Sequence, residues 1–284
     1  MRILRSIFDF YIQSSLHVGL AVLALLHCTN LLAKYNLPPP LSSVVFWGTV
    51  MGYNFLKYSA LFWQGKWKSN RIVALTLFTV LAGICFLYNL LQLSWAAQGY
   101  LLSAGLLVLC YPLLRKYGWL KLFFVSAAVT YITVAFPLLL AGNLHQELVV
   151  LLVQRFFLLS SLLIPFEIWD SANDPLFLHT LPQRLGIPKT KILGYGLLIP
   201  FLILIAWQSN RQGSSLVVAL LTALSIYFTT VKRSMYYTSF WVESVPIVWW
   251  VVLLFCWFSF RFQVSSFRFQ VVPIILSGII YKAL

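Results

Sequence analysis

Three acidic residues lie close together in the segment 164–186, whose sequence is IPFEIWDSANDPLFLHTLPQRLG. Glu167, Asp170 and Asp174 are spaced three and four residues apart, which puts their side chains on one face of a helix. Clustered carboxylates at the end of an apolar helix are costly unless they are paired, hydrated or bound to a metal ion. The spacing therefore indicates a cation-binding site. The alternative is a hydrated helix end that stops at Pro175.

These acids stand out because the chain around them is apolar. Of 284 residues, 61% are hydrophobic and only 9% are charged, whereas a soluble domain has about 25% charged residues. This composition predicts a polytopic integral membrane protein. The net charge of +14 does not indicate a nucleic-acid partner, because the basic residues occupy short gaps between apolar segments. Membrane lipids with anionic head groups, or a diphosphate, are the expected partners of such charges.

Nine apolar segments have lengths near the ~20 residues that a helix needs to cross a bilayer. The fold class is therefore expected to be all-α, a membrane bundle of about nine transmembrane helices. One domain is expected to cover residues 1–260, followed by a short apolar and basic tail at 261–284. The first helix is expected to be retained rather than removed as a signal peptide. The expected helices cover residues 14–33, 41–63, 72–91, 99–114, 122–141, 147–170, 192–207, 214–231 and 239–260.

With nine crossings, the basic residues divide unequally between the two sides of the membrane. The richer side carries Arg2, Arg5, Lys66, Lys68, Arg71, Arg115, Lys116, Lys121, Arg184, Lys189, Lys191, Lys232 and Arg233. The poorer side carries Lys34, Arg211, Arg261, Arg268 and Lys282. Since basic loops stay in the cytoplasm, we expect a cytoplasmic N-terminus and an external C-terminus. The expected location is a plasma membrane of the bacterial type.

The same topology puts the basic loop after the helix at 41–63, the basic loop after the helix at 99–114 and the acidic segment on one face of the membrane. The loop after the helix at 99–114 contains Arg115 and Lys116, and Lys121 lies just beyond it. Carboxylates that hold Mg²⁺, next to basic side chains that hold phosphate, are the groups a diphosphate site requires.

Three sequence features together resemble the UbiA-type intramembrane prenyltransferases. The family's second acidic motif, DxxDxxxD followed by TLP and LG, is similar to EIWDSAND at 167–174, TLP at 180–182 and LG at 185–186. The YPLLRK sequence at 111–116 resembles the family's tyrosine-and-basic loop. Tyr53 and Asn54 resemble the start of its first acidic motif, NDxxDxxxD.

The resemblance implies a nine-helix bundle around a central cavity. It implies a transferase that moves a polyprenyl group from an isoprenyl diphosphate to a lipophilic acceptor inside the membrane. Mg²⁺ would be held by Glu167, Asp170 and Asp174, the last two being the catalytic residues. The residues expected to bind the substrate are Asn54, Lys57, Arg115, Lys116 and Lys121.

The chain departs from the family at the first acidic motif. Aligned on Asn54, the three acids are replaced by Phe55, Tyr58 and Phe62, and Lys57 lies between them. A two-site Mg²⁺ arrangement therefore does not carry over. Lys57 either takes the place of a metal, by contacting a diphosphate or by neutralising Glu167 and Asp170, or it is a structural counter-ion in a decayed site.

Two other functions stay open at this point. A catalytically degenerate relative would keep the fold and bind a lipid or a partner protein, which the missing acids favour. A transporter is the lower alternative, because Lys57 and Arg155 fall within apolar helices and Pro200 and Pro246 could break theirs. Arg155 is expected either to face the cavity or to pair with Glu243.

Overall fold

The computed structural model describes residues 2–63, 69–114, 117–142, 146–207 and 212–257. Most of these residues are helical, and no strand occurs among them. Six helices within this part of the chain are long and apolar enough to cross a membrane. The six are Leu16–Ala33, Asn70–Leu90, Leu120–Leu140, Leu148–Asp170, Ile187–Trp207 and Tyr237–Trp257. The protein is therefore an all-helical protein with the features of an integral membrane protein.

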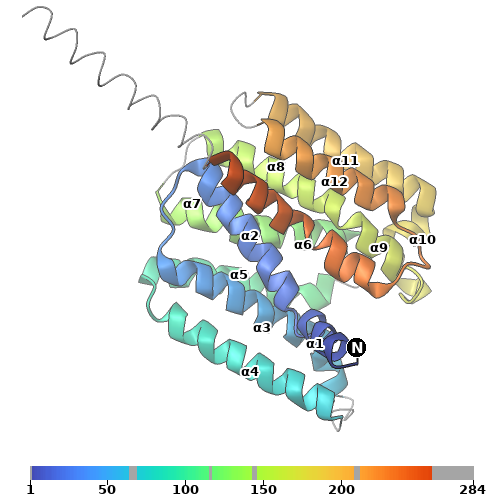
Figure 1. Cartoon of the computed structure of the whole chain (residues 1–284), viewed down its shortest axis with the longest axis horizontal. Coiled ribbons are helices and arrows are strands. Elements are labelled where there is room, and N and C mark those ends of the chain that lie inside the picture. The colour runs from blue at the N-terminus through green and yellow to red at the C-terminus, as the bar shows by residue number, and fades with distance from the viewer. Residues whose placement is uncertain (1, 64–68, 115–116, 143–145, 208–211, 258–284) are drawn as a thin grey trace, which may run out of the picture.

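The first half of the chain is built of α-helices (Figure 1). A short helix comes first, and the left-handed backbone of Lys34 (φ 52°) ends the second. Trp95–Tyr111, within the fifth, is apolar but shorter than the six candidate spans. The helices are α1 (Arg2–Gln13), α2 (Leu16–Ala33), α3 (Pro39–Trp63), α4 (Asn70–Leu90) and α5 (Trp95–Leu114).

The second half contains helices with local breaks. α6 (Leu120–Thr130) continues through a π-helix, η1 (Tyr131–Ala135), into α7 (Phe136–Leu140). α8 (Gln146–Leu162) is separated from α9 (Ile164–Asp170) by Leu163, because Pro165 in the first turn of α9 cannot continue the hydrogen-bond ladder. A 3₁₀ turn, η2 (Leu176–Leu178), and α10 (Leu181–Leu185) follow. The remaining helices are α11 (Ile187–Trp207), α12 (Gln212–Phe228), the π-helix η3 (Tyr237–Val242) and a helix at 245–257.

The apolar core is divided between two large clusters, and α2 contributes to both. Leu25 and Cys28 pack with residues of α8, α11, α12 and the 245–257 helix. Val22 and Leu26 pack with residues of α3, α5 and α7. At Gly19 a Cβ atom would lie 2.8 Å from the side chain of Val50, so this glycine allows α2 and α3 to approach closely. α2 therefore joins the two parts of the bundle.

One helix, α8, carries a buried charge among the apolar side chains. The Arg155 guanidinium of α8 is 2% exposed and donates to Leu25 O at 2.8 Å and to Thr29 Oγ1 at 3.1 Å. It also lies 5.0 Å from the ring centroid of Trp249. Within the described residues, the contacts of Arg155 are thus made with α2 and Trp249 rather than with Glu243. α2 and Trp249 together therefore accommodate the Arg155 cation through a carbonyl, a hydroxyl and an aromatic face.

α1 and α2 meet at a break where α3 supplies polar side chains. Ser15 has a left-handed backbone (φ 59°), so the chain turns between the two helices. The buried Asn54 side chain donates to Ser14 O at 3.0 Å, and Tyr58 donates to Gln13 O at 2.7 Å. Both side chains satisfy carbonyls that the end of α1 leaves unpaired. Asn54 therefore holds the junction between α1 and α2.

α1 also bridges two parts of the bundle. Its Asp9 accepts a hydrogen bond from Tyr236, before η3, and forms an ion pair with Arg71 of α4 at 3.8 Å. The bond to Asp9 raises the pKa of Tyr236. Phe8 packs edge-on against Phe240, with 5.2 Å between ring centroids. α1, α9 and α10 lie toward the same end of the molecule (Figure 1).

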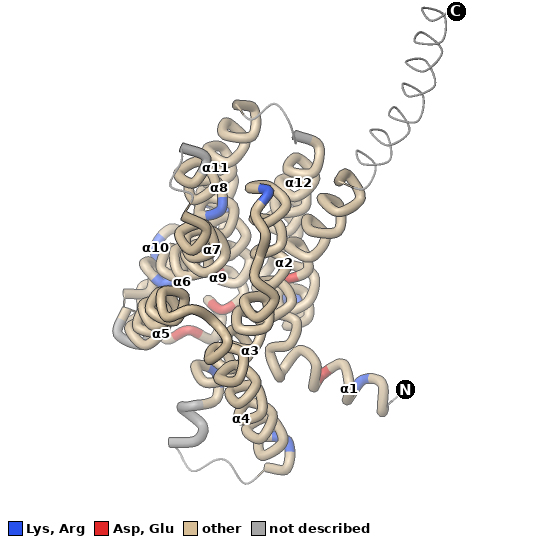
Figure 2. The backbone as a smooth tube through the Cα atoms, turned by 90° about the vertical axis from the view of Figure 1, so that its left-hand side faces the viewer, with Lys and Arg blue, Asp and Glu red and all other residues tan. Residues whose placement is uncertain are grey.

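Each expected helix overlaps one or more helices of the structure, but the count of nine crossings is not confirmed. Six segments meet the length and hydropathy criteria, and α3 is not one of them within the described residues. Figure 2 shows long uncharged tracts along the helices, with the charged residues confined to a few positions. The expected tail at 261–284 lies outside the described residues.

Replacing Asn54 with alanine should destabilise the protein. The change leaves the carbonyl of Ser14 buried without its donor, which costs about 1–3 kcal/mol. The measurement is the thermal unfolding midpoint in detergent. Asn89→Ala is the matched control, because the Asn89 side chain donates to the Cys85 carbonyl within its own helix. An equal or smaller loss for Asn54→Ala than for Asn89→Ala would contradict this role.

Candidate functional site: a lysine among three carboxylates

Two of the three acidic residues lie on α9, after the break that separates this helix from α8. Glu167 and Asp170 are three residues apart on α9, so they lie on the same face of that helix. The chain then turns, with the amides of Asn173 and Asp174 donating to Asp170 O at 2.8 and 2.9 Å. This turn brings the Asp174 carboxylate back toward the other two.

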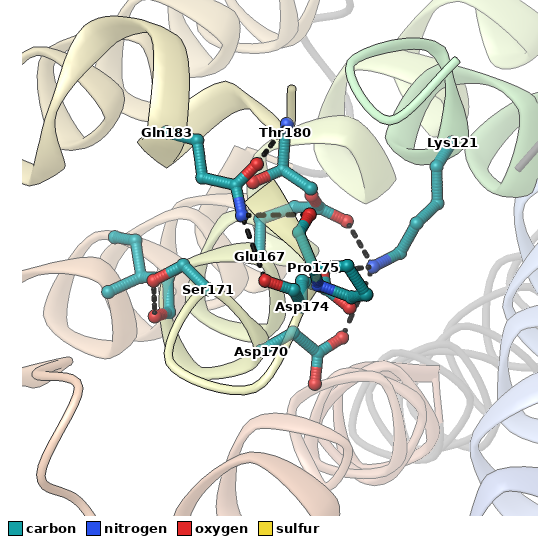
Figure 3. A network of polar contacts seen from close by, with 9 residues as sticks. Lys121, Glu167, Asp170, Ser171, Asp174, Pro175, Thr180 and Gln183 are labelled. Atoms are coloured by element: carbon teal, nitrogen blue, oxygen red, sulfur yellow. Dashed lines mark hydrogen bonds and ion pairs between the residues drawn. The ribbon is translucent and has the colours of Figure 1, made fainter. Parts of the chain in front are cut away.

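The three carboxylates surround the ammonium group of Lys121, at the beginning of α6 (Figure 3). Lys121 Nζ lies 3.2 Å from Glu167 Oε1, 3.2 Å from Asp170 Oδ2 and 3.6 Å from Asp174 Oδ2. The last distance makes an ion pair but exceeds the limit for a hydrogen bond, and Asp174 Oδ2 has no hydrogen-bond donor. We call these four residues the lysine–carboxylate cluster.

The members of the cluster differ in their contact with solvent. The side chains of Glu167, Asp174 and Lys121 are 3%, 10% and 13% exposed, whereas that of Asp170 is 37% exposed. The second oxygen of Glu167 is buried without a hydrogen-bond partner. One ammonium charge faces three carboxylates, so the cluster is formally negative when all are ionised. Asp170 is the member most accessible to water or to a ligand.

The segment after the acids is fixed by its own hydrogen bonds. Thr180 and Gln183 form a capping box at the start of α10, in which the Thr180 amide donates to Gln183 Oε1 at 3.0 Å. Gln183 Nε2 donates to Asp174 O at 3.0 Å and to Pro175 O at 3.4 Å (Figure 3). The TLP sequence thus begins a helix whose first turn holds the backbone of Asp174 in place.

Gly118 connects the segment before Lys121 to the same loop. Its amide donates to Leu178 O at 3.0 Å. A Cβ atom at Gly118 would lie 2.3 Å from that oxygen, so only glycine permits this approach. Since Gly118 lies three residues before Lys121, this bond helps to position the ammonium group opposite the acids.

The other residues expected at the site are elsewhere or are not described. Asn54 bonds the backbone at the α1–α2 junction. Lys57 lies 5.5 Å from the ring centroid of Tyr58 and interacts electrostatically with Glu243. No ion pair joins Lys57 to Glu167, Asp170 or Asp174 among the described residues. Arg115 and Lys116 lie outside them.

The residues that position the cluster were not identified from the sequence. Gly118 had no recognisable signal, because its importance depends on the distant carbonyl of Leu178. The capping box did have one, since Thr or Ser followed three residues later by Gln or Glu is typical of a helix start. Lys121 was expected to contact substrate, and its contacts here are with the three acids.

The cluster does not fit a resident Mg²⁺ ion as it is arranged. Carboxylates have the right chemistry, but Mg²⁺ requires oxygen atoms at about 2.0–2.1 Å in octahedral geometry. Here the three oxygens lie 3.2–3.6 Å from a nitrogen that already stands among them. In the part of the chain that the structure describes, no group of three or more His, Cys, Asp or Glu side chains is arranged to hold a metal.

Comparisons with known proteins add no further constraint. No protein-family model, curated protein or solved structure matches this chain.

Substituting Gly118 with alanine should weaken the site and the fold together. The added methyl group collides with the backbone of Leu178, and relieving such an overlap costs about 1–3 kcal/mol. The unfolding midpoint in detergent should fall accordingly. Gly99→Ala is the control, because a Cβ there meets nothing within 4 Å. An unchanged midpoint in Gly118→Ala would show that the loop does not need this approach.

Proposed function

We propose that this protein is an integral membrane transferase of the prenyltransferase type. It transfers a polyprenyl group from an isoprenyl diphosphate to a lipophilic acceptor within the bundle. The observation that carries the proposal is the lysine–carboxylate cluster at the end of apolar helices, with the TLP segment folded against it. The resemblance of this segment to the UbiA-type motif supports the same function.

In this proposal the charge that binds the diphosphate comes from basic side chains. Lys121 is an ammonium point charge that can bind phosphate without a metal. Arg115 and Lys116 precede it by six and five residues and add positive charge to the same segment. Asp170, the most exposed of the acids, is the contact that an incoming anion would exchange with Lys121. Glu167, almost fully buried, keeps the lysine in place during that exchange.

The chemical logic is stabilisation of a leaving group. Positive charge near the departing diphosphate lowers the barrier to its release, because negative charge builds up there. The allylic cation that remains is stabilised by aromatic faces and kept from water by the apolar helices.

A second candidate function is supported by the charge of the cluster itself. One lysine already neutralises part of the negative charge of the three carboxylates, and no catalytic metal fits between them. A buried ion pair of this kind can be purely structural. The protein would then be a catalytically degenerate relative that binds a lipid or a partner protein.

Diphosphate release from a panel of isoprenyl diphosphates distinguishes these functions. Purified protein in detergent should release diphosphate, with a rate that falls at least about tenfold in Glu167→Gln, because Glu167 holds the lysine that binds the diphosphate and one contact of about 1.4 kcal/mol changes a rate tenfold. Asp9→Asn is the matched control, because it removes a carboxylate on α1, outside the cluster. Release should persist when Mg²⁺ is chelated.

The other outcomes separate the two candidates. Saturable binding of the diphosphates without release, with or without added lipophilic acceptors, would favour the degenerate relative. Absence of both binding and release would rule out the transferase and any role of the cluster in holding a diphosphate.

We further propose that α1 and the lysine–carboxylate cluster are cytoplasmic, on the basis of the basic-residue bias. Cysteine labelling in intact cells tests this orientation. A cysteine introduced at Ile7, which is 62% exposed on α1, should be protected from a membrane-impermeant reagent. A cysteine at Leu91, 77% exposed just after α4, should react. The opposite pattern would reverse the orientation.

A further inference from the structure

The lysine–carboxylate cluster has the composition of a divalent-cation site but already contains a cation. Three carboxylate oxygens from α9 and the following turn point at one centre, and that centre is Lys121 Nζ (Figure 3). Calcium and magnesium ions are bound by such oxygens at about 2.0–2.6 Å. The distances of 3.2–3.6 Å are those of an ammonium group instead.

We infer that Lys121 is a tethered replacement for a divalent metal ion, so that the wild-type cluster excludes Mg²⁺ and Mn²⁺. Two like charges cannot share the centre of the cluster, because a divalent ion and an ammonium group a few ångströms apart repel strongly in a site of low dielectric constant. The inference holds whether the protein transfers prenyl groups or only binds a lipid.

The fixed position of Lys121 strengthens this inference. It lies in the first turn of α6, and Gly118 ties the preceding turn to Leu178 O. The carboxylates are fixed independently, by the break before α9 and by Gln183 on Asp174 O. The segment between α9 and α10 thus bonds on both sides of the cluster: Leu178 O accepts from Gly118, before the lysine, and Asp174 O accepts from Gln183. A metal ion could enter only if the lysine side chain were removed from the cluster.

The buried oxygen of Glu167 indicates what removal of the lysine would create. Glu167 Oε2 has no hydrogen-bond partner, and Glu167 is 3% exposed. Without Lys121, the buried Glu167 carboxylate would lie next to those of Asp174 and Asp170 without the ammonium charge that now stands between them. A divalent ion would then be the favourable way to compensate them, since buried charges need a partner.

Lys121→Met tests the replacement directly. Methionine keeps most of the side-chain volume and removes the charge. The loss of free Mn²⁺, followed by its electron paramagnetic resonance signal, should show one new site per chain. Its affinity should exceed that of wild type by at least roughly tenfold, because the repulsion of the ammonium is gone. The double variant Lys121→Met with Glu167→Gln should lose this site.

Two controls separate a real site from a change in overall charge. Lys121→Arg keeps the positive charge and should bind no more Mn²⁺ than wild type. Lys191→Met removes a lysine that contacts Tyr227 O on α12, outside the cluster, and should also leave Mn²⁺ binding unchanged. If Lys121→Met gains no site, or Lys191→Met gains the same one, the inference is wrong.

Stability gives a second readout, which is independent of any enzymatic activity. Lys121→Met should unfold at a lower temperature without metal, and Mn²⁺ should raise its midpoint, because a ligand that binds only the folded state stabilises it. The midpoint of wild type should not respond to Mn²⁺. A wild-type midpoint that rises with Mn²⁺, and no longer does so in Glu167→Gln, would overturn the inference.

The wild-type protein tests the inference even if Lys121→Met does not fold. Wild type, Glu167→Gln and Asp170→Asn should show the same weak Mn²⁺ binding, because the acids are not available to the metal. Stoichiometric binding by wild type that is lost in either acid variant would contradict exclusion of the metal. Failure of the diphosphate-release assay would leave this result unaffected, so the two proposals can fail separately.

Discussion

The constraint on which this structure depends is the cost of three carboxylates at the end of an apolar bundle. An unpaired charge there is highly unfavourable, and removing one partner from a buried pair is more damaging than never having had it. Lys121 meets this constraint from the start of α6. The local features around it follow from the same requirement: a proline break before α9, a capping box at α10 and a glycine at 118. Each of these features fixes the backbone from which a side chain of the cluster extends.

The sequence was sufficient to predict the long apolar helices and the grouping of the three acidic side chains. Apolar segments define most of the long helices to within a few residues, as the agreement between 72–91 and α4 (Asn70–Leu90) illustrates. α1 was missed because it mixes charged and apolar residues, such as Arg5 and Asp9, and has no long apolar tract. The break between α8 and α9 falls inside one apolar segment, where only Pro165 marks it.

The partner of the acids could not be read from the sequence, because it depends on how helices pack. Lys57 and Lys121 are both lysines near helix ends on the same expected side of the membrane. Which one reaches Glu167 depends on the rotation and depth of α3 and α6 in the bundle. In the structure Lys57 lies by Tyr58 and interacts with Glu243, and Lys121 meets the acids. Arg155 is similar, since its partners Leu25 and Thr29 belong to a helix 126 or more residues away in sequence.

The two π-helices show how backbone irregularity adds polar contacts inside an apolar bundle. A π-helix changes the hydrogen-bond ladder of a helix locally and often occurs at functional positions. η3 ends next to Glu243, and Phe240 O within it accepts hydrogen bonds from both the Ser244 hydroxyl and the ring of His17. η1 forms part of the path between α6 and α7. At η3, polar groups thus lie inside the apolar bundle at a break in a regular helix.

The separation of Lys121 from its partners along the chain has a consequence for biosynthesis. Lys121 and Asp170 are 49 residues apart, so α6 leaves the ribosome and meets the membrane before the acids have been made. During that interval the ammonium group has no carboxylate to neutralise it. Its place in the first turn of α6 allows it to stay in the aqueous interface until α8 and α9 follow. The same lysine in the middle of α6 would have to enter the bilayer as an isolated charge.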